Sequence, residues 1–114
     1  MATGEMCCEG MKAALDKCLK KIPRDDDVKR QAEFFKAISD PARVKIIYAL
    51  ASGELCVCEL MLIMGMQQTV VSHHLKILKY AGIISDRKVG KWVNYSLADP
   101  RALDALKSIE AART

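Results

Sequence analysis

The 114-residue sequence has no long hydrophobic run, no signal-like start and no motif typical of a catalytic site. A run of about eighteen apolar residues is the minimum for a membrane-spanning helix, so such a helix is excluded. The first ten residues contain no basic residue and no apolar stretch, so we expect a cytoplasmic protein. There is no phosphate-binding loop, paired-carboxylate motif or Ser/Cys/His constellation, so we do not expect an enzyme.

The five cysteines are an odd number, which does not favour a disulfide framework. In a reducing cytoplasm cysteines act more often as core residues, metal ligands or reactive thiols. Cys18 lies on an apolar helical stripe, and we therefore predict that it is a small core residue. The other four form two pairs, the vicinal Cys7 and Cys8 and the closely spaced Cys56 and Cys58.

The net charge of +4 is concentrated in one part of the chain. Residues 66–101 contain six basic and two acidic residues, which accounts for the whole excess. A local positive charge of this kind suits the neutralisation of nucleic-acid phosphates. The alternative is a charged face that only contacts solvent.

Local signals predict helices along most of the chain. Apolar residues recur at helical spacing in residues 11–22, and three aspartates at 25–27 suit the start of a second helix. Asp40-Pro41 and Asp99-Pro100 each place a capping residue before a proline, which predicts a helix after each pair. We expect a flexible arm at residues 1–10 and one domain at residues 11–114.

Residues 54–82 predict a helix-turn-helix. A short apolar segment leads to Gly65, and Val71, Leu75 and Leu78 follow at helical spacing. In this arrangement the second helix lies in the DNA major groove. Two strands, Ile83–Lys88 and Lys91–Leu97, then form a hairpin with a basic tip. The fold class is thus mostly α with a small β-hairpin, a winged helix-turn-helix.

The polar residues of the second helix and the hairpin are candidates for DNA contacts. Side chains near the helix start suit base edges, while basic residues suit phosphates. A metal pair made of the adjacent His73 and His74 is disfavoured, because neighbouring helical residues diverge by ~100°. The predicted DNA-binding residues are Gln68, Thr69, Ser72, His73, Lys76, Arg87, Lys88 and Lys91, and Lys79 also suits the backbone.

Cys56 and Cys58 form a candidate site for soft ions, which thiolates prefer. Two residues apart, the thiols diverge by roughly 200° on a helix but share one side of an extended chain. Both thiols reach one ion only if the start of the first helix of the predicted helix-turn-helix is extended or distorted. The alternative is that both are small buried residues.

Two thiols bind weakly, so we expect Cys7 or Cys8 to complete the site, unless that pair is only a chance feature of a polar terminus. Arsenite or antimonite requires three thiolates, whereas cadmium or lead accepts three or four. The sequence does not choose between these ions.

Four segments carry a resemblance to a known family, namely residues 36–43, 54–60, 71–76 and 86–92. From Phe35 to Ile109 the sequence resembles the ArsR/SmtB family of winged helix-turn-helix, metal-responsive repressors. The resemblance implies a homodimer, an operator with two-fold symmetry, and release from DNA when a metal or metalloid ion binds. The segment with both cysteines matches the thiolate-sensing members.

The sequence also departs from relatives of this family. Arsenic-sensing members often have a third cysteine where this chain has Met61. Cadmium- and lead-sensing, CadC-like members take thiols from the N-terminal arm, although theirs are spaced rather than vicinal. Zinc-sensing members have Asp-x-His on the last helix, whereas this chain has Asp99-Pro100-Arg101, so we do not expect that zinc site. The recognition helix opens with residues 67–70, Gln-Gln-Thr-Val, rather than Ser-Gln-Pro-Thr.

The first and last helices have more apolar surface than the small core can cover. We therefore expect dimerisation through the N- and C-terminal helices, the alternative being that both fold back on their own core. The predicted function is repression relieved by a thiophilic ion. The alternatives are a redox-sensing repressor and a thiol-rich metal-buffering or interaction module. The operator, the regulated genes and the physiological ion are not predicted.

Overall fold

The computed structural model describes residues 11–112 and divides the chain into two compact units, one up to Gln31 and one from Ala32. The predicted arm, residues 1–10 with Cys7 and Cys8, lies outside the described residues. The single domain at residues 11–114 therefore stays a prediction. Among the described residues, no helix is long and apolar enough to span a membrane.

The first unit contains α2 (Lys12–Lys21) and the start of α3 (Asp25–Ala37). The three aspartates stand in the first turn of α3, as predicted, where negative charge is stabilising. No residue of α2 is buried, and Cys18 is exposed. The prediction of Cys18 as a core residue is therefore wrong for this chain. The reason is that an apolar stripe becomes core only where another element packs against it.

The second unit is built on α4 (Pro41–Ala51), the helix predicted to follow Asp40-Pro41. The Asp40 side chain caps it by accepting hydrogen bonds from the backbone N–H groups of Ala42, at 2.9 Å, and Arg43, at 3.3 Å. Ile46 and Ile47 are completely buried. Local capping and central packing thus both hold α4 in place.

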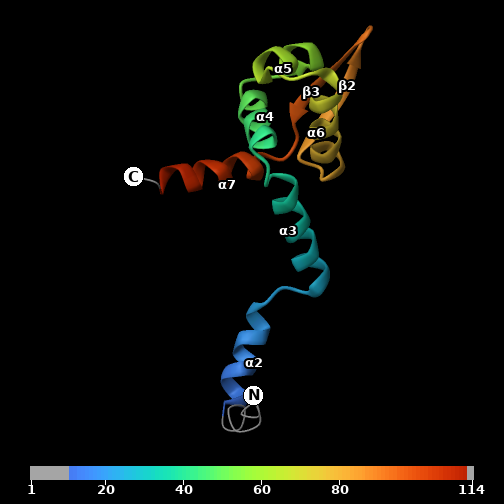
Figure 1. Cartoon of the computed structure of the whole chain (residues 1–114). Coiled ribbons are helices and arrows are strands. Elements are labelled where there is room, and N and C mark those ends of the chain that lie inside the picture. Colours follow the sequence, from blue (N-terminus) through green and yellow to red (C-terminus); the bar gives the residue numbers. More distant parts are fainter. Residues whose placement is uncertain (1–10, 113–114) are drawn as a thin grey trace. The chain divides into compact units, whose positions relative to one another are not determined.

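The predicted helix-turn-helix consists of α5 (Val57–Met64) and α6 (Gln68–Tyr80), shown in Figure 1. Gly65 ends α5 in the left-handed conformation, with φ of 65°, which glycine adopts without the steric cost of a Cβ. The buried residues of α6 are the three predicted from helical spacing, Val71, Leu75 and Leu78.

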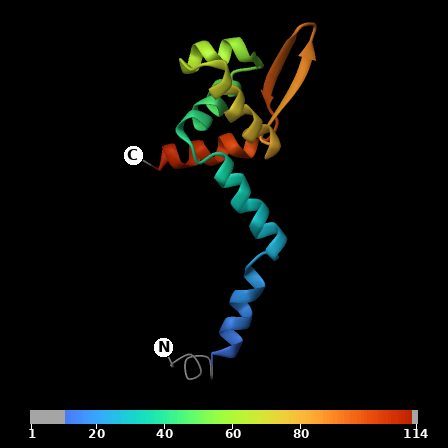
Figure 2. The ribbon, with the colours of Figure 1, turned by 45° about the vertical axis from the view of Figure 1, so that its right-hand side comes forward.

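The hairpin strands are β2 (Ile84–Val89) and β3 (Trp92–Leu97), and Figure 2 shows the hairpin projecting from the helices of this unit. Each strand and the turn lie one residue or less from their predicted positions. A third strand, β1 (Leu55–Cys56), pairs with β3 and gives the antiparallel order β1-β3-β2. The predicted hairpin is therefore two strands of a three-stranded sheet.

The last helix is α7 (Pro100–Ala111), capped by the Asp99 side chain through the Arg101 N–H at 3.0 Å. Ala102 is buried against the core, whereas Ile109 is 70% exposed. The remaining buried apolar residues come from α3 to β2, and they form one core. That core consists of Ala37, Ile38, Ala42, Ile46, Ile47, Leu50, Leu60, Met64, Val71, Leu75, Leu78, Ile83, Ile84 and Ala102.

Candidate nucleic-acid interface and thiol site

One face of α6 carries the polar residues predicted to contact DNA. All five are exposed, while the opposite face of the helix is buried in the core. A helix with this division presents hydrogen-bonding side chains outward without disturbing its packing. The exposed set is Gln68, Thr69, Ser72, His73 and Lys76.

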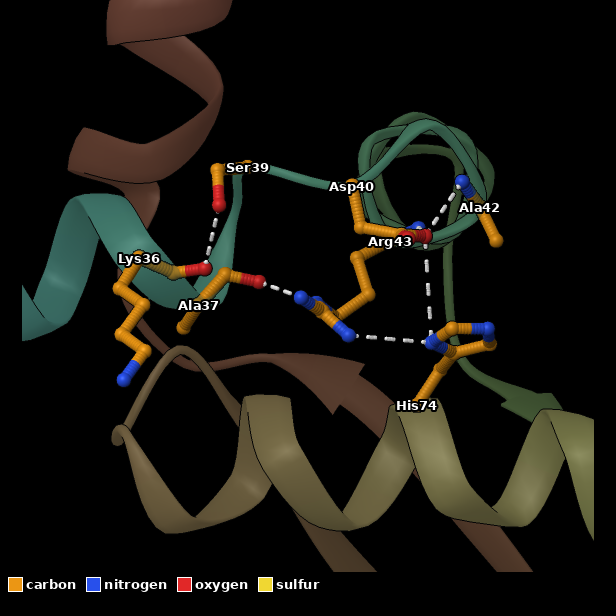
Figure 3. Close-up of polar contacts among 7 residues, drawn as sticks. All are labelled: Lys36, Ala37, Ser39, Asp40, Ala42, Arg43 and His74. Atoms are coloured by element: carbon orange, nitrogen blue, oxygen red, sulfur yellow. Dashed lines mark hydrogen bonds and ion pairs between the residues drawn. The ribbon is translucent and has the colours of Figure 1, made fainter.

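His74, the neighbour of His73, points instead toward the start of α4 (Figure 3). Its Nδ1 atom lies 3.2 Å from Nη1 of Arg43 and 3.9 Å from Oδ2 of Asp40. Since a guanidinium only donates, Nδ1 accepts, which places the ring proton on Nε2. Arg43 also donates to the backbone carbonyl of Ala37 at the end of α3. These contacts tie α6 to α3 and α4.

The role of His74 was not predicted, although its spacing contained a signal. It follows Val71 by three residues and precedes Leu78 by four, so it lies on the buried side of α6. Its side chain is only 13% exposed. The two adjacent histidines therefore lie in different environments, His73 exposed and His74 largely buried.

The three predicted cations of the hairpin are not equivalent. Arg87 on β2 donates twice to the carboxylate of Glu54, Nε to Oε2 at 2.7 Å and Nη2 to Oε1 at 2.8 Å. This contact lowers the pKa of Glu54 and raises that of Arg87. Lys88 and Lys91 are exposed, and neither forms an ion pair with another described residue. These two lysines are the more available for phosphate contacts.

Lys79, also considered for the DNA backbone, donates to Oδ2 of Asp86 at 2.8 Å. The pair joins α6 to β2, and it raises the pKa of Lys79. Much of the positive charge of residues 66–101 is therefore balanced locally. Fewer cations are free to contact DNA than the six basic residues of this segment indicate.

Cys56 and Cys58 lie on either side of a strand-to-helix junction. Cys56 ends β1 with an extended backbone, φ −88° and ψ 167°, and is the N-cap of α5, whose first turn contains Cys58. Of the two cysteines, Cys56 has the extended backbone considered for a shared ion, whereas Cys58 already belongs to the helix. Cys56 is half-buried and Cys58 is exposed. Neither belongs to the buried core, which disfavours the alternative that both are small core residues.

Glu59 holds this junction by accepting a hydrogen bond from the Cys56 N–H at 3.0 Å. That backbone bond is the main reason why the pKa of Glu59 is lowered. The arrangement is the carboxylate half of a capping box, here with a cysteine at the cap position. The backbone at Cys56 is therefore fixed from the helix side.

Further soft ligands near the thiols are thioethers. In residues 11–112, no group of three or more His, Cys, Asp or Glu side chains is placed to hold a metal ion. Cys58 does line a shallow, open groove, together with Met61 and Met66. The thiol pair alone does not complete a site for a thiophilic ion. The other thiols of the chain are the exposed Cys18 on α2 and, outside the described residues, Cys7 and Cys8.

The fold and these motifs agree with a family comparison. Residues 40–86 match the model of the bacterial regulatory protein, arsR family. Over 81 residues the chain is 40% identical to the arsenical resistance operon repressor of Escherichia coli K12, covering 70% of this chain and 69% of the relative. The chain belongs to the arsR family. The relatives are transcriptional regulators, so this member is grouped with DNA-binding proteins and not with enzymes.

Two more comparisons refine this assignment. Over 69 residues the arsR-family chain is 52% identical to the cadmium resistance transcriptional regulatory protein CadC homolog of Staphylococcus aureus, and the match spans 60% of this chain but only 57% of the relative. A homodimeric winged helix-turn-helix DNA-binding domain, Mb0332 of Mycobacterium bovis, superposes with a TM-score of 0.67 at 28% identity. That match covers 90% of this chain and 86% of the other.

Proposed function

We propose that this arsR-family protein is a transcriptional repressor that leaves its operator when a thiophilic metal or metalloid ion binds Cys56 and Cys58. The observation that carries the proposal is the position of the two thiols at the junction of β1 and α5. One thiol is attached to the winged sheet and the other to the first helix of the helix-turn-helix. An ion that joins both therefore acts on the sheet that includes the hairpin and on the helix that packs against α6.

A homodimer is the proposed DNA-binding form. On α3 and α7, Phe35 is 55% and Ile109 is 70% exposed, although both are large apolar side chains. Leu15 and Leu19 on α2 are likewise exposed, and so is Ile22 directly after that helix. A second copy of the chain would cover such surfaces, and the Mycobacterium bovis relative is described as homodimeric. The operator is then a sequence with two-fold symmetry.

The proposed inducers are arsenite or antimonite, or else cadmium or lead. The names of the two bacterial relatives, one for arsenical and one for cadmium resistance, support both classes. We propose that Cys7 and Cys8 supply the missing thiolates. Three thiolates suit the metalloids, and a fourth suits cadmium or lead. If the arm does not bind the ion, Met61 is the proposed additional ligand.

The experiment is a titration of operator DNA with reduced protein, with and without arsenite or cadmium. We expect either ion to weaken DNA binding in the unaltered protein. Cys56→Ser and Cys58→Ser should each abolish the response and leave ion-free DNA binding intact, because neither thiol lies on the exposed face of α6 or on the hairpin. Cys18→Ser is the matched control, since its exposed thiol lies on α2 and is expected to be irrelevant.

Deleting residues 1–8 tests the arm, and it should weaken ion affinity while DNA binding persists. Protection of the thiols from alkylation then counts the ligands, and three protected thiols favour a metalloid whereas four favour cadmium or lead. A deletion variant that responds at unaltered ion concentrations would remove the arm from the site. If peroxide released the protein from operator DNA and the ions did not, the redox-sensing alternative would be favoured.

A further inference from the structure

We propose that Glu54 is the positioning residue that transmits the state of the cysteine segment to the DNA-binding hairpin. The inference rests on the proposed function and names the element through which it operates. Glu54 immediately precedes β1, and its carboxylate contacts both strands of the hairpin. It accepts two hydrogen bonds from Arg87 on β2 and one from Asn94 on β3, the last at 3.3 Å.

The register of the sheet places this contact beside Cys56. Cys56 lies opposite Asn94 in the β1–β3 pair, and Asn94 lies opposite Arg87 in the β2–β3 pair. Directly opposed residues of an antiparallel pair project from the same face of a sheet. Cys56, Asn94 and Arg87 therefore form one row across the three strands. Glu54 bonds to two members of that row and is two residues from the third.

The geometry of the pair suits orientation more than stability. Two parallel hydrogen bonds between a guanidinium and a carboxylate fix their relative orientation. The Arg87 side chain is 66% and the Glu54 side chain 27% exposed, and such surface pairs contribute little to folding. A contact that is directional but weak can be rearranged by the binding of an ion without unfolding the domain.

The cysteine segment is constrained from two sides. Glu59 holds the Cys56 N–H from within α5, at 3.0 Å, and Glu54 holds the hairpin from before β1. If the Cys56 thiol turns toward an ion shared with Cys58, the backbone between these two carboxylates must adjust. The adjustment reaches Arg87 through Glu54, since only one residue separates Glu54 from Cys56.

A second ion pair of the hairpin provides a matched control. Lys79 and Asp86 join α6 to β2 at 2.8 Å, close to the length of the Glu54–Arg87 contact. Asp86 precedes Arg87 and so projects to the opposite face of β2. Its partner is on α6 and not in the cysteine segment. Loss of this pair should affect DNA binding equally with and without the ion.

The test measures the ratio of the DNA dissociation constants with and without saturating arsenite or cadmium, by fluorescence anisotropy at fixed salt. We expect Glu54→Gln to reduce this ratio at least about fivefold, within the range typical of allosteric coupling. The number of thiols protected by the ion should not change. Asp86→Asn should alter both constants by the same factor. A ratio unchanged in Glu54→Gln would overturn the proposal, because a merely structural role weakens both states alike.

A charge exchange keeps the test decisive if Glu54→Gln fails to fold. Arg87→Glu alone should lose the coupling, and combining it with Glu54→Arg should restore at least half of it. Absence of that rescue would overturn the role of the pair. An unaltered protein with no response to either ion would overturn the proposed function and this inference together. A normal response that survives in every Glu54 variant would overturn only the inference.

Discussion

The two adjacent histidines of α6 allow stability and DNA recognition to be tested separately. His74 is 13% exposed and accepts a hydrogen bond from Arg43, whereas His73 is exposed and lies on the proposed DNA-binding face. We expect His74→Ala to destabilise the fold and His73→Ala to weaken DNA binding. The substitutions remove the same side chain from consecutive positions, so each serves as the control for the other.

The magnitude for His74 follows from its contact with a charged donor. Removing the acceptor of such a bond costs about 1.5–3 kcal/mol. At about 4–8 °C per kcal/mol for a domain of this size, the melting temperature should fall by roughly 6–24 °C. His73→Ala should change stability by less than about 0.5 kcal/mol, as expected for a surface position. It should weaken specific DNA binding by about 1–3 kcal/mol if the ring contacts a base.

Thermal unfolding by circular dichroism, at one fixed protein concentration because a dimer is proposed, measures the first effect. Anisotropy with operator and unrelated DNA measures the second. His74→Asn adds a check, because its Oδ1 lies as many bonds from Cβ as Nδ1 of histidine and can accept from Arg43. Equal destabilisation by His73→Ala and His74→Ala would refute the assignment of the two faces of α6.

Four other substitutions have defined outcomes. Lys88→Gln and Lys91→Gln should each weaken binding to all DNA sequences alike and reduce the salt dependence by about one phosphate contact, and loss confined to particular base pairs would contradict this role. Gly90→Ala should destabilise the hairpin by about 1–2 kcal/mol, since φ is 63° there, and unchanged urea unfolding would exclude this cost. Glu59→Gln should remove an acid dependence. Folding lowers the pKa of Glu59, so its contribution to the free energy of unfolding is complete above its ordinary pKa of 4.5 and is lost as the pH falls through the folded pKa. The unaltered protein and the variant should therefore differ in the pH dependence of this free energy only in acid. A difference in slope confined to neutral pH would refute the argument.

The helices were predictable because their signals are local. Asp40-Pro41 identifies the start of α4 from two adjacent residues, and the spacing of Val71, Leu75 and Leu78 identifies the buried face of α6. Gly65 similarly marks the turn between α5 and α6. Each of these signals is contained within one or two helical turns, so no knowledge of distant residues is needed.

Features that depend on residues far apart in the sequence were missed. The strand β1 has two residues and exists only because Leu55 and Cys56 pair with β3, about forty positions later. Arg87 was assigned to DNA from its charge, but its contact with Glu54 spans 33 residues and depends on the same sheet. Cys18 shows the converse error, because a correct helical stripe does not reveal what covers it.

The strand that was not predicted explains how two thiols can act on DNA binding in the proposed mechanism. Through β1, Cys56 belongs to the sheet that includes the hairpin, and through α5, Cys58 belongs to a helix that packs against α6. A regular helix over both cysteines would separate the thiols and would lack the β1 pairing that connects Cys56 to the hairpin. The observed junction instead connects one thiol to each DNA-binding element. An ion bound by both would therefore set the angle between the hairpin and α6, which is the geometry that a groove and its flanking phosphates must match.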